Sequence, residues 1–292
     1  MKILIIQERG RHEKNREFRE ALCLQRALKR AGQQSTVWGL GYENFVIPFN
    51  EIANDYNVVI SLENYDTGWH PNISAFNGLK CFWSIDSHCV VNDHIRFCEL
   101  NKIDLILNSS AQYLHRFSEC TKHGVWFPNG YPSDLIHPLA NVKREHDVGF
   151  VGSSITSRDA ILDELSTRIP IKRETFVIGN DMVRALSSYK IAFNYNIADD
   201  INFRSFEAPG AGALLLTNYT PGLEKLYDID NEVIIYESFQ DILEKIQDLL
   251  SDDFHLEKIA KAGYNRAIRD HSYDSRASQL LDLIKQYKQP LN

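Results

Sequence analysis

The sequence predicts an α/β protein with two domains, each built on a parallel β-sheet. Short apolar runs alternate with amphipathic helical segments along the chain. Repeated strand–helix–strand units give parallel sheets that helices cover on both faces. The polar segment 141–146 separates two such series. A length of 292 residues also favours roughly two domains of ~150 residues each.

The first series begins at the amino terminus. Its predicted strands are residues 2–7, 35–38, 57–62, 79–85, 103–108 and 124–127. The clearest helix is 14–31, which stops at Gly32, a residue type that commonly ends helices. A segment rich in proline and glycine, residues 127–138, closes the series. We expect a first domain over residues 1–140.

The second series begins at residue 147. Its predicted strands are 147–151, 172–178, 189–195, 213–217 and 232–236, and its predicted helices are 157–168, 181–187, 203–209 and 238–251. Helices 254–269 and 274–288 complete the chain. We expect a second domain over residues 145–273. Two open α/β domains joined by a linker normally bind a ligand in the cleft, at the carboxyl ends of their strands.

The composition is that of an ordinary globular protein, with 43% hydrophobic and 24% charged residues. A net charge of −7 argues against a strongly basic nucleic-acid surface. No stretch reaches the ~20 apolar residues that a bilayer span needs, and no export signal is visible. The five scattered cysteines indicate reduced thiols. We therefore expect a cytoplasmic protein without a transmembrane segment.

The stretch 202–217 carries the strongest candidate site. It predicts a short helix, a tight turn and a buried strand, with Arg204 and Glu207 three residues apart on one face of the helix. A cation beside a carboxylate suits a sugar nucleotide, which offers a diphosphate to arginine and ribose hydroxyls to glutamate. The alternative is a surface ion pair ahead of a core strand, and this stretch alone does not decide between the two.

A second candidate follows the predicted strand 147–151. Gly152 ends the strand, hydroxyl residues including Ser153 follow, and Arg158 lies in the first turn of the next helix. Glycine allows close backbone approach to a ligand, and a helix start offers free N–H groups to an anion. The alternative is an ordinary turn capped by Ser153 or Ser157.

Two weaker candidates belong to the same predicted domain. Backbone groups of Ile178 and Gly179, at the end of predicted strand 172–178, could form an edge for a nucleobase. Asp199, with Asp200 beside it, could hold sugar hydroxyls. An ordinary turn and an ordinary helix cap are the respective alternatives.

Asp86 and His88 follow the predicted strand 79–85 of the first domain. Residues at the carboxyl end of a strand lie at the ligand-binding edge, so this pair could act as a general base and its partner. Residues 62–66, which include Glu63 and Asp66, are the parallel case after strand 57–62. Otherwise Asp86 caps the next helix and His88 packs in a turn.

Several catalytic signatures are absent from the sequence. There is no Gly-x-Gly-x-x-Gly after the first strand, no Gly-x-Ser-x-Gly, no phosphate-binding loop and no His-Glu-x-x-His. The histidines show no metal-ligand spacing. We therefore expect no metal site.

The second half of the chain resembles the carboxyl-terminal domain of spore-maturation-protein (CgeB-type) glycosyltransferases. The resemblance covers about residues 145–288. It rests on segments 147–153 with Arg158, 202–204, 206–213 with Thr217, and the closing segments 262–266 and 271–273 with Arg276. The first half is similar only through residues 82–86 and 128–130.

This resemblance implies a GT-B architecture, in which two Rossmann-like domains face each other across a cleft. The second domain would bind a nucleotide-sugar donor and the first an acceptor, without an essential metal or other cofactor. Glu207 would bind the ribose hydroxyls, and Arg204, within the motif that starts at Asn202, the diphosphate. Gly152 and Ser153 would approach the phosphates by their backbone.

The resemblance also bears on the mechanism. Many retaining GT-B enzymes carry a Glu-x₇-Glu pair, and here Asp199 stands in the first position. The last helix of this architecture usually crosses back, so 274–288 would belong with the first domain. Arg204, Arg158 or a helix start would stabilise the leaving diphosphate. Asp86, helped by His88, would take the acceptor proton if the reaction inverts the configuration.

We therefore expect a hexosyl- or pentosyltransferase that uses a nucleoside diphosphate sugar. A sugar-nucleotide epimerase or hydrolase of the same fold is one alternative, and a non-catalytic nucleotide- or glycan-binding module is another. A transferase that modifies nucleic acid is a third. The acidic balance of the chain disfavours it, but four basic residues near the acceptor side keep it open: Arg9, Arg11, Lys14 and Arg16.

Overall fold

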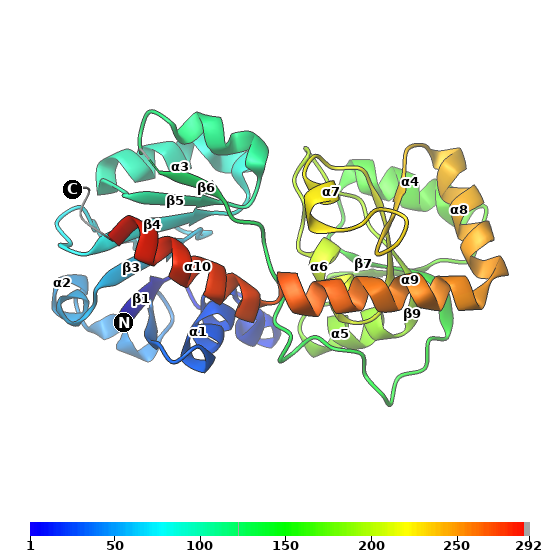
Figure 1. Ribbon diagram of the computed structural model, residues 1–292, viewed down its shortest axis with the longest axis horizontal. Coiled ribbons are helices and arrows are strands. Elements are labelled where there is room, and N and C mark those ends of the chain that lie inside the picture. The colour runs from blue at the N-terminus through cyan, green and yellow to red at the C-terminus, as the bar shows by residue number, and fades with distance from the viewer. Residues whose placement is uncertain (122, 289–292) are drawn as a thin grey trace. The chain divides into compact units, whose positions relative to one another are not determined.

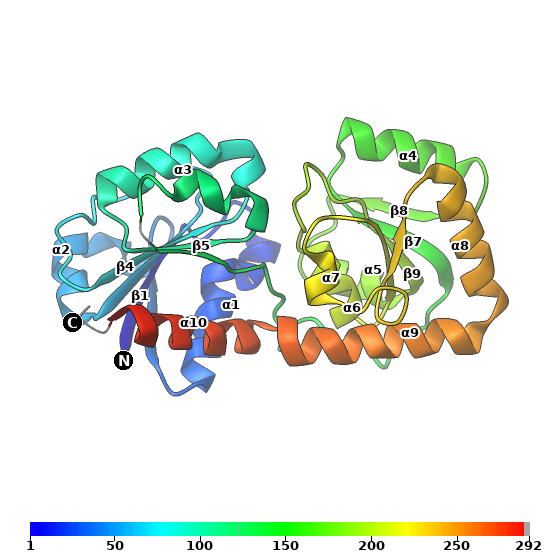
Figure 2. The same ribbon diagram turned by 45° about the horizontal axis from the view of Figure 1, so that its top comes forward.

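The computed structural model describes residues 1–121 and 123–288 and contains two α/β units (Figures 1 and 2). The first unit consists of Met1–Asn129 together with the carboxyl-terminal helix from Tyr273 onward. The second unit is the continuous stretch Gly130–Ser272. Each unit has one parallel sheet. The predicted α/β class with two parallel sheets is therefore confirmed.

The sheet of the first unit has the strand order β2-β1-β3-β4-β5-β6. Its strands are β1 (Lys2–Ile6), β2 (Gln34–Trp38), β3 (Val58–Leu62), β4 (Leu79–Ser84), β5 (Leu105–Asn108) and β6 (Gly124–Trp126). All five residues of β3 are buried, as expected for a central strand covered on both faces. All six predicted strands are present, with small differences at their ends.

Helices flank this sheet, and α1 and α10 lie side by side (Figures 1 and 2). The α-helices are α1 (Glu20–Arg30), α2 (Phe49–Ile52), α3 (Ser87–Asn101) and α10 (Tyr273–Lys288). Short 3-10 segments are η1 (Glu13–Phe18), η2 (Glu43–Val46), η3 (Ala53–Asp55) and η4 (Ala111–Phe117). Arg30 Nε donates to Asp274 Oδ1 at 2.7 Å, which ties α1 to α10.

The prediction of one helix over 14–31 is wrong. Arg19 has an extended backbone (φ −62°, ψ 140°) and separates η1 from α1. Its guanidinium is buried, 3.3 Å from the carboxylate of Glu20 and 3.9 Å from that of Glu8. Periodicity does not reveal the break, because a tertiary ion-pair cluster causes it.

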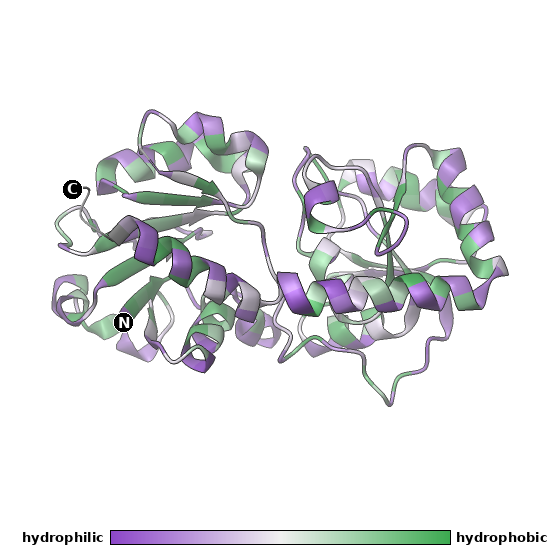
Figure 3. Ribbon diagram, viewed as in Figure 1, coloured by the Kyte–Doolittle hydropathy of each residue, from purple (hydrophilic) through white to green (hydrophobic). Residues whose placement is uncertain are grey.

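The sheet of the second unit has the order β11-β10-β9-β7-β8. Its strands are β7 (His146–Gly152), β8 (Lys172–Thr175), β9 (Tyr189–Phe193), β10 (Leu214–Asn218) and β11 (Ile234–Tyr236). Its helices are α4 (Thr156–Ser166), α5 (Asn180–Ser187), α6 (Arg204–Gly210), α7 (Leu223–Leu226), α8 (Phe239–Ser251), α9 (Asp253–Arg266) and the π-helix η5 (Ala267–His271). The apolar core lies between the sheet and the helices, and Figure 3 shows apolar residues concentrated along the strands.

Two boundaries differ from the sequence predictions. The predicted strand 172–178 ends at Thr175, because Phe176 adopts a left-handed conformation (φ 58°). The boundary between the units lies at Asn129–Gly130, not within residues 141–146. Tyr131 is fully buried in the second unit, and its backbone N–H donates to the carbonyl oxygen of His271 at 3.1 Å.

The predicted helix 274–288 is present as α10 (Tyr273–Lys288), which belongs to the first unit. Arg276 of this helix is buried and donates hydrogen bonds to the backbone carbonyls of Pro128 and Asn129. No helix in the described ranges combines the length and the apolar character that crossing a membrane requires.

Candidate functional site

The main candidate site lies in the second unit, at the carboxyl ends of β7, β9 and β10. The turn 152–155 follows β7, the loop 194–203 follows β9, and α6 begins where that loop ends. Because these strands are parallel neighbours, their carboxyl ends share one edge of the sheet. This edge is where open α/β sheets bind ligands.

Arg204 and Glu207 lie in the first turn of α6 and form an ion pair. Arg204 Nη1 donates to Glu207 Oε2 at 2.7 Å. Each side chain is only 14% exposed, so this is not the solvated surface pair of the alternative interpretation. A pair at this depth holds its guanidinium in a defined orientation at the ligand-binding edge.

Arg158 lies in the first turn of α4 and is itself buried. Its Nη1 donates to the carbonyl oxygen of Ser153 at 3.0 Å, and its Nη2 donates to that of Tyr195 at 3.2 Å. Burial lowers the pKa of Arg158, and the positive charge of Arg204 lowers it further. Two guanidinium groups therefore lie close enough to repel each other, and an anion bound between them would relieve that repulsion.

The turn after β7 depends on Gly152. A Cβ at this position would lie 2.8 Å from the ring of Phe150, whose centre is 5.6 Å from the guanidinium carbon of Arg158. Ser153 has an exposed side chain and accepts from Arg158 through its carbonyl. The alternative of a turn capped by Ser153 or Ser157 does not hold, because the N-cap residue of α4 is Ile155, whose side chain makes no capping hydrogen bond.

A buried network of amides and hydroxyls supports the loop after β9. Asn202 Nδ2 donates to Asn194 Oδ1 at 3.1 Å, and the backbone N–H of Asn202 donates to Asn196 Oδ1 at 3.1 Å. Asn194 Nδ2 also donates to Thr217 Oγ1 at 3.1 Å. Asn202 therefore supports the loop that leads into α6. Asn194 and Asn196 are not among the predicted site residues, and their signal in the sequence is an asparagine repeat at the end of an apolar strand.

Ile178 and Gly179 do not end a strand but lie in the loop between β8 and α5. The loop starts beside the site, since the N–H of Phe176 donates to the carbonyl oxygen of Gly152 at 3.3 Å. Gly179 is the N-cap residue of α5 with φ 62°, a conformation that favours glycine. The ring of Phe176, which the sequence analysis did not select, is 76% exposed.

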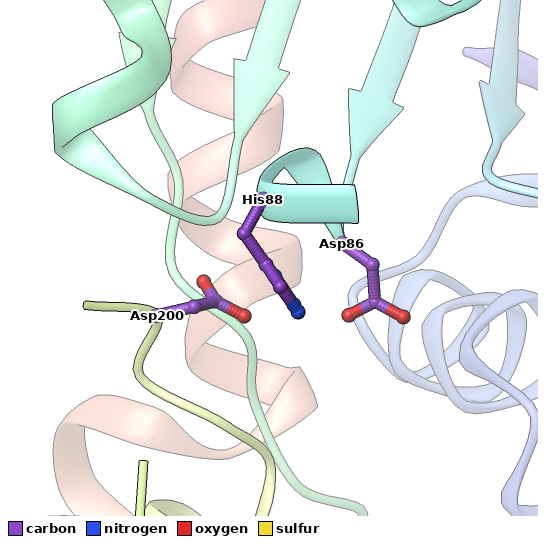
Figure 4. A group of neighbouring side chains, drawn as sticks. All are labelled: Asp86, His88 and Asp200. Carbon is purple, nitrogen blue, oxygen red and sulfur yellow. The ribbon is translucent and has the colours of Figure 1, made fainter. Parts of the chain in front are cut away.

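Asp199 is exposed and adopts a left-handed backbone conformation, as Ala198 does. Its neighbour Asp200 is 4% exposed, and Figure 4 shows it in the loop that precedes α6. The sequence analysis selected Asp199, whereas the loop buries Asp200.

Asp86 and His88 lie in the first unit, at the start of α3 (Figure 4). Asp86 occupies the N-cap position, but its side chain makes no capping hydrogen bond. His88 is half-buried in the first turn of the helix. The predicted capping role of Asp86 is therefore wrong for its side chain, which leaves the carboxylate for other contacts.

Glu63, which follows β3, is bonded to the turn that carries Asp86. Its Oε2 accepts the backbone N–H groups of Ile85 at 3.2 Å and Asp86 at 2.7 Å. Burial raises the pKa of Glu63 to about 7, and the negative charge of Asp86 contributes. The sequence offered one signal for Glu63, a carboxylate directly after a buried strand, but the residue was not among the selected site residues.

Buried histidines are expected to make the first unit acid-sensitive. Burial lowers the pKa values of His70 and His94 to about 4. The unfolded chain binds protons near pH 6.5 and the folded protein does not, so stability should fall between about pH 6.5 and 4. The expected loss in the free energy of unfolding is about 3 kcal/mol for each histidine. Glu63 acts oppositely, because its raised pKa destabilises the fold as the pH rises from about 4.5 to 7.

The His94→Gln variant tests this expectation. It should lose about 3 kcal/mol less stability than the wild-type protein between pH 7 and pH 4. Urea unfolding followed by tryptophan fluorescence measures it, since Trp38, Trp69, Trp83 and Trp126 all belong to the first unit. The exposed His115 provides the control, His115→Gln. Equal pH dependence in the His94→Gln variant and the wild-type protein would contradict the assignment.

Comparisons with known proteins agree with this geometry. Residues 133–282, just over half of the chain, match a family model described as "Glycosyl transferase-like". No curated protein matches the chain in sequence.

Several solved structures are similar in fold. A glycosyltransferase from Rickettsia africae has a TM-score of 0.69 at 13% identity, over 99% of both chains. The sucrose-phosphate synthase of Thermosynechococcus elongatus has a TM-score of 0.65 at 12% identity, over 98% of both chains. HepE from Anabaena, in complex with UDP and glucose, has a TM-score of 0.65 at 12% identity, over 98% of this chain and 100% of its own.

At these identities the structures establish the fold, and the family model establishes the family. The narrower CgeB-type resemblance stays a prediction. Taken with the two parallel-sheet units and the site at the carboxyl ends of β7, β9 and β10, these findings show that the chain belongs to the glycosyl transferase-like family and has the GT-B fold.

Proposed function

We propose that this protein transfers a sugar from a nucleoside diphosphate sugar to an acceptor hydroxyl. The observation that carries the proposal is the Arg204–Glu207 pair beside the buried Arg158. The two guanidinium groups repel each other, and an anion such as a diphosphate bound beside them would relieve this repulsion. Glu207 adds the acceptor atoms that ribose hydroxyls need.

UDP is the nucleotide to test first. HepE was solved in complexes with UDP and with UDP-glucose, and an α-glucosyltransferase of similar fold was solved with UDP. In this chain Phe176 follows β8, its backbone N–H donates to the carbonyl oxygen of Gly152, and its ring is exposed. An aromatic ring next to a phosphate site offers a surface on which a pyrimidine base can stack.

The proposed transfer separates charge as the bond from the sugar to the diphosphate breaks. Arg204 would stabilise the negative charge on the departing diphosphate, and Arg158 would add to the positive potential. Asp86, with His88, would accept the proton of the acceptor hydroxyl if the reaction inverts the configuration. The proposal assigns the leaving group to arginines and includes no essential metal. The hexosyl or pentosyl nature of the sugar belongs to the proposal as well.

Donor-site variants test the proposal. Arg204→Ala is expected to weaken UDP binding about 10–100-fold, because a hydrogen bond to a charged group contributes about 1.5–3 kcal/mol. Glu207→Ala should weaken it less, since it removes hydroxyl contacts and leaves the guanidinium. Isothermal titration calorimetry with UDP measures both affinities.

Arg269→Ala is the matched control. Arg269 also pairs with a carboxylate in the second unit, that of Asp270, but on an exposed helical segment. The affinity of the Arg269→Ala variant for UDP should equal that of the wild-type protein. Wild-type affinity in both the Arg204→Ala and the Glu207→Ala variants would remove the donor site from this edge. Release of UDP from UDP-glucose without an acceptor would indicate a hydrolase instead of a transferase.

A further inference from the structure

One carboxylate oxygen organises the turn between β4 and α3. Glu63 Oε2 accepts two consecutive backbone N–H groups, those of Ile85 and Asp86. Its side chain is 15% exposed, so water competes weakly for these bonds. The backbone of Asp86 is therefore fixed by a residue that directly follows β3, another strand of the same sheet, 23 positions earlier in the chain.

The groups that face Glu63 itself are two carboxylates, a neutral histidine, an uncharged amide and the phenol of Tyr65, whose raised pKa keeps it neutral near pH 7. Negative charges face it from Asp86 at the start of α3 and from Glu20 on α1. His94 Nε2, also on α3, lies 3.6 Å from Glu63 Oε2, but burial lowers the pKa of His94 to about 4 and keeps it neutral. Directly after β1, Gln7 contributes only an uncharged amide, which donates to the carbonyl oxygen of Glu63 at 3.0 Å.

We propose that Glu63 is a positioning residue that holds Asp86 in place and whose charge makes Asp86 a stronger proton acceptor. The inference rests on the proposed function, in which Asp86 removes the proton of the acceptor hydroxyl. The acceptor oxygen forms its bond to the sugar while the bond to the diphosphate breaks. The proton passes to Asp86 and then to solvent.

Mutual repulsion supplies the coupling between the two carboxylates. The charge of Asp86 opposes the ionisation of Glu63, and Coulomb interactions are reciprocal. An ionised Glu63 therefore favours the protonated form of Asp86, which is the form that proton transfer creates. At low pH Glu63 is neutral and this assistance is absent. As the pH rises through about 7, Glu63 ionises and assists proton removal.

Two variants separate the charge of Glu63 from its hydrogen bonds. Glu63→Gln keeps an oxygen that can accept both N–H groups but cannot ionise. We expect wild-type kcat to rise severalfold between pH 6 and pH 8, and the Glu63→Gln variant to lack this rise while retaining measurable turnover. Glu63→Ala removes the acceptor oxygen as well and should lower kcat about tenfold or more at every pH. Affinity for UDP should stay unchanged in both.

Glu20→Gln serves as the matched control. Glu20 also faces Glu63 but accepts from the side chain of Gln7 instead of from the turn. Its variant should keep the rise in kcat between pH 6 and pH 8. If Glu63→Gln shows the wild-type pH profile, the charge role is overturned. If Glu63→Ala binds UDP and turns over as the wild-type protein does, the positioning role is overturned.

The Asp86→Asn variant separates failure of this inference from failure of the proposed mechanism. If Asp86→Asn is inactive and Glu63→Gln keeps the wild-type pH profile, only the inference about Glu63 fails. If Asp86→Asn is active, the base assignment itself fails and the inference fails with it. If Arg204→Ala and Glu207→Ala both bind UDP normally, the donor site fails independently of either carboxylate.

Discussion

Replacing Asp86 by asparagine is expected to lower turnover by about 10²- to 10⁴-fold, the usual contribution of a positioned general base. Asparagine has nearly the same shape and leaves the backbone N–H that donates to Glu63 unchanged. The turn before α3 should therefore keep its conformation. The lost property is the ability to take a proton from the acceptor hydroxyl.

Measurements at saturating donor isolate this effect. Asp86→Asn should bind UDP with wild-type affinity, because the donor residues belong to the second unit. Asp93→Asn is the control, since Asp93 is an exposed carboxylate on the same helix. Wild-type turnover of Asp86→Asn would exclude Asp86 as the base. It would favour a retaining reaction, in which no protein base need stand at the acceptor.

Replacing Arg276 by methionine is expected to lower the free energy of unfolding of the first unit by about 3–5 kcal/mol. Arg276 is 2% exposed. Its Nε donates to the carbonyl oxygen of Pro128 at 2.8 Å, and its Nη2 donates to that of Asn129 at 3.0 Å. Methionine fills most of the volume but leaves both buried carbonyls without these donors, at about 1–3 kcal/mol for each unsatisfied group.

Urea unfolding followed by tryptophan fluorescence measures this change, because the tryptophans all report on the first unit. Arg30→Ala is the matched control. Arg30 binds Asp274 of the same helix, but the two side chains are 42% and 45% exposed, and such a pair contributes about 0–1 kcal/mol. A loss below 1 kcal/mol in the Arg276→Met variant would show that the Arg276 hydrogen bonds do not anchor α10.

Local patterns in the sequence predicted the strands well, because a buried parallel strand is an apolar run and needs no partner to be recognised. Breaks in regular structure were harder to predict. Arg19 interrupts the expected helix 14–31 because the carboxylates of Glu8 and Glu20 hold its side chain. Phe176 ends β8 through a left-handed backbone, which apolar residues around it gave no reason to expect.

The residues of the candidate site also fall into two groups, those that local spacing predicted and those that depend on distant contacts. Arg204 and Glu207 were found because their spacing alone places them together. The role of Arg158 as a link between two loops was not predicted, since its partner Tyr195 is 37 residues away. Glu63 and Asn194 were not selected because their importance lies in hydrogen bonds to other strands and loops. Composition and spacing carry no information on such contacts.

The division of the chain into one interrupted unit and one continuous unit also has a consequence during protein synthesis. The ribosome delivers Gly130–Ser272 as a single stretch, so the fold of the second unit needs no segment from elsewhere in the chain. The first unit, although its sheet emerges first, must wait for α10 to cover α1 and to supply Arg276. The amino-terminal half is therefore the part of the nascent chain that stays incomplete longest and has the greatest need of a chaperone.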